Sequence, residues 1–224
     1  MELPIFNDSL KSSGTWTARL AREQELYRDW QQSRAPLPAV HPDWQSGSSE
    51  RLGEALALVS QWATASEPRL DRERLNEINR ILSGVESTGE LLRVAPPPIL
   101  SELHDPAPAS ILPRLLDLAF DWFTTEGFAE LHPLEQATLV YLRLLDLSPF
   151  ASENQLTALV AAGFHTRRGG FPALIAPLWS LEEAEDARYR QALEAAFRML
   201  TQPLVEYFAD ALISSMQRAR EGGS

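Results

Sequence analysis

The sequence predicts a mostly helical protein with one short β-hairpin, from three features. Apolar residues recur every three or four positions along most of the 224-residue chain, which is the spacing of one helix face. Prolines and glycines gather between these periodic segments, where they end helices. One segment, 85–94, carries a turn signal followed by apolar residues, as a hairpin does. We therefore expect a helical bundle.

The N-terminal part of the chain predicts three helices. Their apolar stripes cover residues 16–33, 50–64 and 71–82. Thr15 is the expected N-cap of the first helix and Gly84 ends the third. Proline and Ser-Gly-Ser-Ser residues predict a linker or surface loop over 34–49. We place a boundary between an N-terminal helical extension with a Pro/Ser-rich loop, 1–66, and the main helical domain, 67–224.

The hairpin expectation rests on the Ser87-Thr88-Gly89 turn signal and on Leu91, Leu92 and Val94 after it. The following run, Ala95-Pro96-Pro97-Pro98, excludes a helix interior or a central strand. A proline-rich connector without β structure is the alternative, and both remain open at this stage.

Beyond residue 108 the chain predicts five further helices, over 110–125, 133–147, 152–167, 181–200 and 203–220. The second is apolar on nearly every side, which is typical of a helix at the centre of a bundle. Gly169-Gly170 ends the third of these helices, 152–167. Thr201 is the expected N-cap of the last helix.

Composition excludes several classes of function. The chain has no cysteine, so thiolate metal sites, thiol nucleophiles and disulfides are excluded. Its 20 basic and 31 acidic residues give a net charge of −11, which disfavours nucleic acid as a partner. The start lacks a signal-peptide pattern, and no apolar run approaches a membrane span. We expect a cytoplasmic protein that binds neither nucleic acid nor membrane.

Motif searches exclude further classes. The chain contains no phosphate-binding Gly-x-x-x-x-Gly-Lys loop and no dinucleotide-binding Gly-x-Gly-x-x-Gly. The four histidines, His41, His104, His132 and His165, include no pair four residues apart, so we predict no metal site.

One constellation does stand out. His132-Pro133-Leu134 opens the central helix, which ends at Ser148-Pro149-Phe150, and Asn154 follows. This pattern resembles the Fic family (filamentation induced by cAMP), whose motif is His-Pro-Phe-x-(Asp/Glu)-Gly-Asn-Gly-Arg-x-x-Arg. Segments 75–84, 89–93 and 168–172 resemble the helix, the hairpin flap and the Gly-x-Pro that surround that motif. The resemblance covers about residues 70–180.

The resemblance implies a chemistry. Family members mostly transfer AMP, or a related phosphate-bearing group, to a protein hydroxyl. The motif histidine is the base, the acidic residue holds magnesium, and the glycines with the following helix N-terminus bind phosphate. The arginines neutralise phosphate charge, and the flap pairs with the target segment. The corresponding flap here would be Gly89, Glu90, Leu91, Leu92 and Arg93.

This chain departs from the motif at most of its functional positions. Ser148 replaces the histidine, so we predict that it is catalytically inactive. The degenerate nucleotide-binding positions are Phe150, Ser152, Glu153, Asn154 and Gln155, of which only Phe150 and Asn154 keep the family residue. Leu156 and Leu159 replace both arginines. Ser152 and Gln155 fit a capping box, which would satisfy the amides that bind phosphate in the family.

We therefore expect a non-catalytic binding or regulatory protein with a protein partner and no cofactor. One alternative is a protein adenylyltransferase using ATP and magnesium, with His132 or His165 as the base. Another is a purely structural helical protein, and self-association is left open.

Overall fold

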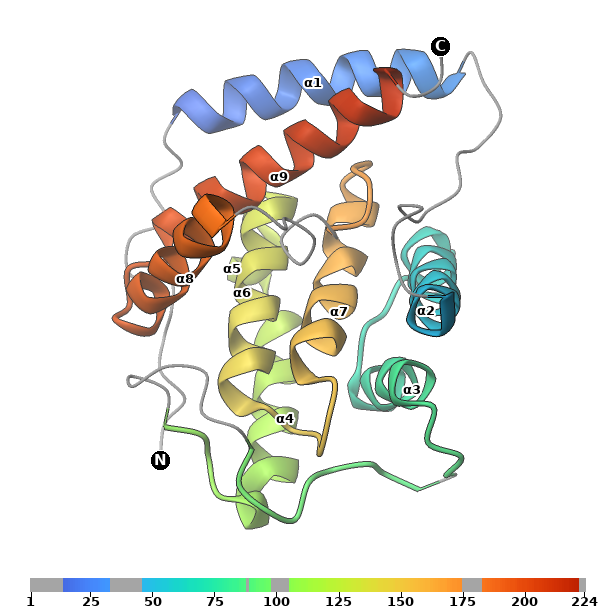
Figure 1. Cartoon of the computed structure of the whole chain (residues 1–224), viewed down its shortest axis with the longest axis vertical. Coiled ribbons are helices and arrows are strands. Elements are labelled where there is room, and N and C mark those ends of the chain that lie inside the picture. Colours follow the sequence, from blue (N-terminus) through green and yellow to red (C-terminus); the bar gives the residue numbers. More distant parts are fainter. Residues whose placement is uncertain (1–13, 33–45, 88, 98–104, 175–182, 222–224) are drawn as a thin grey trace.

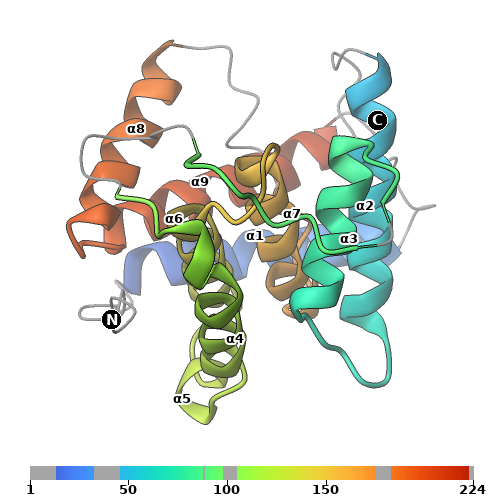
Figure 2. The ribbon, with the colours of Figure 1, turned by 90° about the horizontal axis from the view of Figure 1, so that it is seen from below.

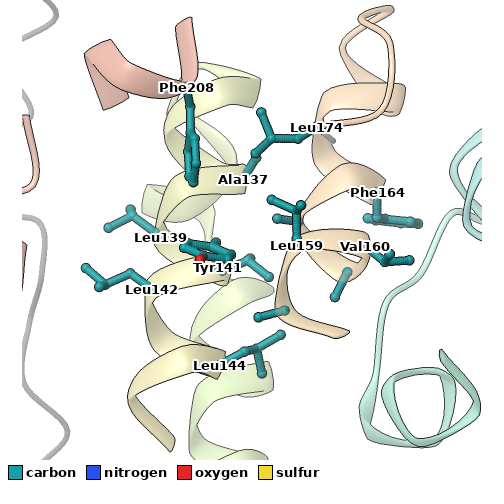
Figure 3. Packing of buried hydrophobic residues seen from close by; sticks show 14 of the residues in the cluster. Ala137, Leu139, Tyr141, Leu142, Leu144, Leu159, Val160, Phe164, Leu174 and Phe208 are labelled. Carbon is teal, nitrogen blue, oxygen red and sulfur yellow. The ribbon is translucent and has the colours of Figure 1, made fainter. Parts of the chain in front are cut away.

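The computed structural model describes residues 14–32, 46–87, 89–97, 105–174 and 183–221 (Figure 1). Its centre is a pair of helices side by side, α6 (Pro133–Leu147) and α7 (Asn154–Arg168). Nearly every residue of α6 after its first turn is buried, as the sequence predicts for the central helix. Figure 3 shows the side chains between the pair, among them Leu144 of α6 and Leu159 of α7.

The remaining helices surround this pair. Towards one side of α7 lie α2 (Ser46–Thr64) and α3 (Arg72–Ser83), and α4 (Leu112–Phe123) packs against α6. The opposite side holds α8 (Glu183–Phe197) and α9 (Gln202–Glu221), while α1 (Gly14–Gln32) lies along α9 (Figure 1). A 3-10 turn (Ala109–Ile111) precedes α4, and a single-turn helix, α5 (Glu126–Ala129), follows it.

The predicted helical fold is confirmed, and several helix ends differ from expectation. Residues 46–49 belong to α2 rather than to a loop, because a glycine costs a helix only about 1 kcal/mol and the packing of the following turns outweighs it. Thr15 lies inside α1 and is not its cap. Thr201 directly precedes α9, and its carbonyl accepts from the amides of Leu204 and Val205, but its hydroxyl has no hydrogen-bond partner among the described residues. Residues 34–45 and 181–182 lie outside the described residues.

No hairpin forms among the described residues of 85–94; Thr88 lies outside them. The segment makes one isolated antiparallel bridge, between Leu92 and Phe150. The reason lies in α3, where Asn76 donates to the Gly89 carbonyl (3.3 Å) and accepts from the Leu91 amide (2.7 Å). These backbone groups are therefore bonded to a side chain instead of a second strand. Figure 2 shows this connection passing the end of the α6–α7 pair.

Residues on both sides of the predicted boundary at 66 contribute to one hydrophobic core, from Trp16 to Met216. The 1–66 and 67–224 division remains a prediction about domain organisation. None of the described helices is long and apolar enough to cross a bilayer.

Gly169 marks a close approach between the end of α7 and the start of α6. A Cβ at this position would lie 2.6 Å from Cβ of Pro133 and 3.1 Å from Cδ2 of Phe171. The Gly169 carbonyl also accepts a hydrogen bond from Gln24 of α1 at 2.6 Å. Three helices therefore meet where only a glycine fits.

His165, near the end of α7, is buried with 5% of its surface exposed. Its Nδ1 lies 3.0 Å from Oε1 of Gln136. The Gln136 amide nitrogen donates to backbone carbonyls, including that of Leu131 at 3.0 Å. Oε1 is therefore an acceptor, and Nδ1 of His165 carries the proton. Burial lowers the pKa of His165 to about 3, with a smaller contribution from the charge of Arg168.

The first prediction concerns Gly169. Gly169→Ala should lower the free energy of unfolding by about 1–3 kcal/mol, because the added methyl overpacks the contact with Pro133. Urea denaturation measures the change. Gly127→Ala is the matched control, since nothing lies within 4 Å of a Cβ there, and it should leave stability unchanged or raise it by less than about 1 kcal/mol. Equal stabilities for the two variants would contradict the close approach.

The second prediction is a pH dependence. His165 has a folded-state pKa near 3, below the value of about 6.5 in the unfolded chain. The unfolded chain therefore binds the extra proton, and stability is lost as the pH falls below about 6.5. The loss due to His165 should reach about 2 kcal/mol at pH 5.

His165→Gln should remove this part of the pH dependence. Urea denaturation at pH 7.5 and pH 5 measures it in both proteins, and the other titrating groups are common to both. Identical pH dependences would show that His165 is not held neutral in the folded protein.

Candidate functional site

The turn between α6 and α7 holds the family motif positions, and its first residue is Ser148. Ser148 is 2% exposed and adopts the left-handed conformation, with φ of 40°. Its Oγ donates to the Leu145 carbonyl at 2.7 Å, and its amide donates to the Leu144 carbonyl at 2.9 Å. The hydroxyl thus completes the end of α6, and position 148 provides no proton acceptor that titrates near neutral pH.

Arg93 fixes this end of α6 from the side of the flap residues. Its buried guanidinium donates to the carbonyls of Ser148 (2.7 Å) and Leu147 (3.3 Å) and to those of Ala95 and Ala107. Its backbone amide donates to the Pro149 carbonyl at 2.8 Å. Burial lowers the pKa of Arg93, but an arginine remains charged in a protein. The cation therefore stabilises the negative end of the α6 dipole.

Asn154 closes the turn on itself. Its Oδ1 accepts from the Phe150 amide and its Nδ2 donates to the Phe150 carbonyl, both at 2.8 Å. Phe150 is 1% exposed, so its ring anchors the turn in the core. These two retained motif residues hold the shape of the turn.

The predicted capping box of Ser152 and Gln155 is wrong. α7 begins at Asn154, its N-cap is Glu153 with φ of 58°, and no side chain of the described residues caps it. Ser152 lies one position before the N-cap, and its carbonyl accepts from Nδ2 of Asn79 at 3.0 Å. Gln155 Nε2 donates to the hydroxyl of Tyr189 instead. Among the described residues, neither Ser152, Glu153 nor Gln155 therefore caps the first-turn amides of α7 with its side chain.

The side chains around these amides do not suit a phosphate. The turn, 148–156, contains no lysine, arginine or histidine. Ser152 and Glu153 are exposed, and Glu153 would add a negative charge beside any bound anion. Leu159, at the second arginine position, is 1% exposed and packs in the core.

A magnesium ion finds no fitting ligand set here. Ser152 stands at the acidic position, and a serine hydroxyl is a poor ligand for Mg²⁺, which prefers carboxylates. Among the described residues no group of three or more acidic or histidine side chains could hold a metal ion.

The predicted flap residues do lie beside the turn. Leu92 bridges Phe150, and Arg93 bonds the end of α6, as above. Glu90 forms an ion pair with Arg72 of α3, which also pairs with Asp117 of α4 at 3.0 Å. Together with Asn76 at Gly89 and Leu91, these contacts attach the segment to α3 and to the end of α6, and Arg72 connects it indirectly to α4.

The alternative bases lie at the other end of the helix pair. His132 is the N-cap of α6, where its Nδ1 accepts from the Leu134 amide at 3.2 Å and Glu135 completes a capping box. His165 lies near the end of α7. Because α6 and α7 are antiparallel (Figure 1), both histidines are remote from Ser148.

Sequence reasoning missed the polar side chains that shape the site. Asn76 and Asn79 are buried beside Leu75 and Ile78 on one face of α3. A polar residue within an apolar stripe is the signal that could have identified them, since a buried amide needs a partner. The contact between Gln155 and Tyr189 carries no such local signal.

Comparison with known proteins identifies relatives of this chain in sequence. No family model matches the chain. It is 30% identical to the protein adenylyltransferase fic-1 of Caenorhabditis briggsae over 112 residues, which are 50% of this chain and 21% of that protein. A second relative, the protein adenylyltransferase Fic of Nematostella vectensis, is 27% identical over 124 residues, 55% of this chain and 29% of that protein. The chain therefore spans less than a third of these relatives.

Solved structures agree over a longer stretch. A fragment of Fic-1 from C. elegans superposes with a TM-score of 0.70 at 17% identity, covering 95% of this chain and 73% of that one. A Fic domain containing signaling protein from Bacteroides thetaiotaomicron gives a TM-score of 0.69 at 17% identity, covering 91% and 98%. The chain is thus related in sequence to Fic proteins and has their fold, which confirms its resemblance to the Fic family.

Proposed function

We propose that this chain is a Fic-like protein that binds a protein partner and does not transfer nucleotides. The observation that carries the proposal is the state of Ser148: its hydroxyl is buried and donates to the Leu145 carbonyl. A positioned base contributes about 10²–10⁴-fold to such a transfer, and the two histidines among the described residues, His132 and His165, lie at the other end of the α6–α7 pair.

Charge supports the same proposal. A nucleoside triphosphate at the first turn of α7 would meet Glu153 in place of a glycine and would lack both arginines of the family motif, whose positions hold Leu156 and Leu159. The arginines of the motif would supply charge-assisted hydrogen bonds to phosphate, which are about twice as strong as neutral ones. Backbone amides alone must then offset the repulsion by Glu153.

A protein partner is supported by the segment beside the turn. Leu91 and Leu92 are held beside the turn by the Asn76 side chain and by the bridge to Phe150. Val94, two residues after Leu92, is 94% exposed. A fixed segment that already forms one strand-like bridge and carries an exposed apolar side chain is suited to pairing with an extended peptide.

One observation favours the alternative, a protein adenylyltransferase. The first-turn amides of α7 have no side-chain cap among the described residues, so the part of an anion site that is built from backbone is present. The related proteins from Caenorhabditis and Nematostella carry the name adenylyltransferase. Binding and transfer experiments separate the two proposals.

The third prediction concerns binding of ATP with magnesium. The wild-type chain should bind it more weakly than about 1 mM, because the turn 148–156 contains no lysine, arginine or histidine and Glu153 adds a negative charge. The variant Glu153→Gly/Leu156→Arg removes the negative charge and restores one arginine, and it should bind at least about tenfold more tightly. Position 153 has a positive φ that glycine adopts readily.

Isothermal titration calorimetry measures both proteins. Micromolar, magnesium-dependent binding by the wild type would contradict the proposed function. An unchanged affinity in the variant would show that charge at these positions does not limit binding.

The fourth prediction concerns transfer. Incubation with labelled ATP and cell lysate should label no protein with the wild-type chain. Ser148→His should also label none, because the restored base still lacks the magnesium ligand and both arginines. Circular dichroism verifies that the variant is folded. Labelling by the wild type would establish the adenylyltransferase alternative.

A further inference from the structure

Position 155 stands where the family motif has its second glycine, and its side chain reaches a third helix. Gln155 is in the first turn of α7, and its Nε2 donates to the Tyr189 hydroxyl of α8 at 3.1 Å. The same hydroxyl is hydrogen-bonded to the Tyr141 hydroxyl of α6. Tyr141, Tyr189 and Gln155, which we call the hydroxyl cluster, therefore join α6, α7 and α8.

The two tyrosines of the hydroxyl cluster are buried. Tyr141 is 0% exposed and Tyr189 is 7% exposed. Burial and the neighbouring Tyr189 raise the pKa of Tyr141, so its phenol stays neutral at neutral pH. A buried hydroxyl that loses its partner bears the full cost of its desolvation. Removing one member should therefore weaken the attachment of the other two.

The body of α8 packs chiefly on α9 rather than on the central pair. The rings of Tyr189 and Tyr207 are 5.6 Å apart, and Arg188 forms an ion pair with Asp210. After α8 the chain turns through Met199, with φ of 69°. The amides of Met199 and Leu200 close this turn on the carbonyls of Ala196 and Ala195.

We propose that Tyr189 is a latch that couples the docking of α8 to the first turn of α7. A partner or ligand that engages the turn and moves Gln155 would remove a hydrogen bond from Tyr189 and loosen α8. Conversely, release of α8 would free Gln155 at the turn. The regulatory role rests on the proposed function, because that function places the binding event beside this turn.

Hydrogen exchange of the ligand-free protein tests the latch. Tyr189→Phe keeps the ring and removes the hydroxyl, and Gln155→Leu removes the amide. Each variant should exchange about tenfold faster in α8, over 187–197, and Tyr189→Phe should also accelerate exchange at 154–157. If the two side chains act as one unit, the double variant should exchange in α8 no faster than the single variants.

A matched control separates a latch from general destabilisation. Thr138 is a buried residue of α6 whose Oγ1 donates to the Leu134 carbonyl of its own helix at 2.8 Å. Thr138→Val should change global stability without selective acceleration of α8. Uniform acceleration by Tyr189→Phe, additive effects of the two latch variants, or unchanged exchange in α8 would each overturn the proposal. The readout needs no nucleotide, so a failed latch and a failed functional proposal are distinguishable.

Discussion

The arrangement of the site depends on the guanidinium of Arg93 at the C-terminal end of α6. The guanidinium donates hydrogen bonds to the carbonyls of Leu147 and Ser148. Because α6 ends here, no following helical turn supplies amides to these carbonyls. The guanidinium simultaneously bonds the carbonyls of Ala95 and Ala107, which flank the connection to α4. Because the charge is buried, it stabilises only where several oxygens surround it. The end of α6, the flap residues and the connection to α4 are therefore placed by one side chain.

The motif residues that this chain keeps are those that shape the turn. Asn154 bonds both backbone groups of Phe150, and the Phe150 ring lies in the core. The positions that changed, 148, 152, 153, 155, 156 and 159, are those to which the family assigns chemistry. A fold can keep its turn while its site changes, because backbone closure and phosphate binding use different atoms of one segment.

The sequence predicts the helices well and the polar contacts poorly. α6 begins and ends where expected, because Pro133 starts the helix and the apolar pattern stops at Leu147. The hairpin and the Ser152 capping box were wrong for a common reason: each assigned backbone groups to local partners. In the structure Asn76 and Asn79, both on α3, bond Leu91 and Ser152 across 15 and 73 residues of sequence. Such long-range partners leave no pattern in the local sequence.

The failure of that capping box changes what would exclude a nucleotide under the proposed function. Were Ser152 to cap α7, the anion site would be blocked by hydrogen bonds, and charge substitutions alone would not reopen it. With no side-chain cap among the described residues, the amides of α7 still carry the positive end of the helix dipole. Selectivity then depends on the side chains around them, where Glu153 repels an anion and leucines supply no charge. Gln155 adds a second difference, since the residue in place of a glycine connects this turn to α8. The turn thus joins α7 to α8, while its first-turn amides have no side-chain cap among the described residues.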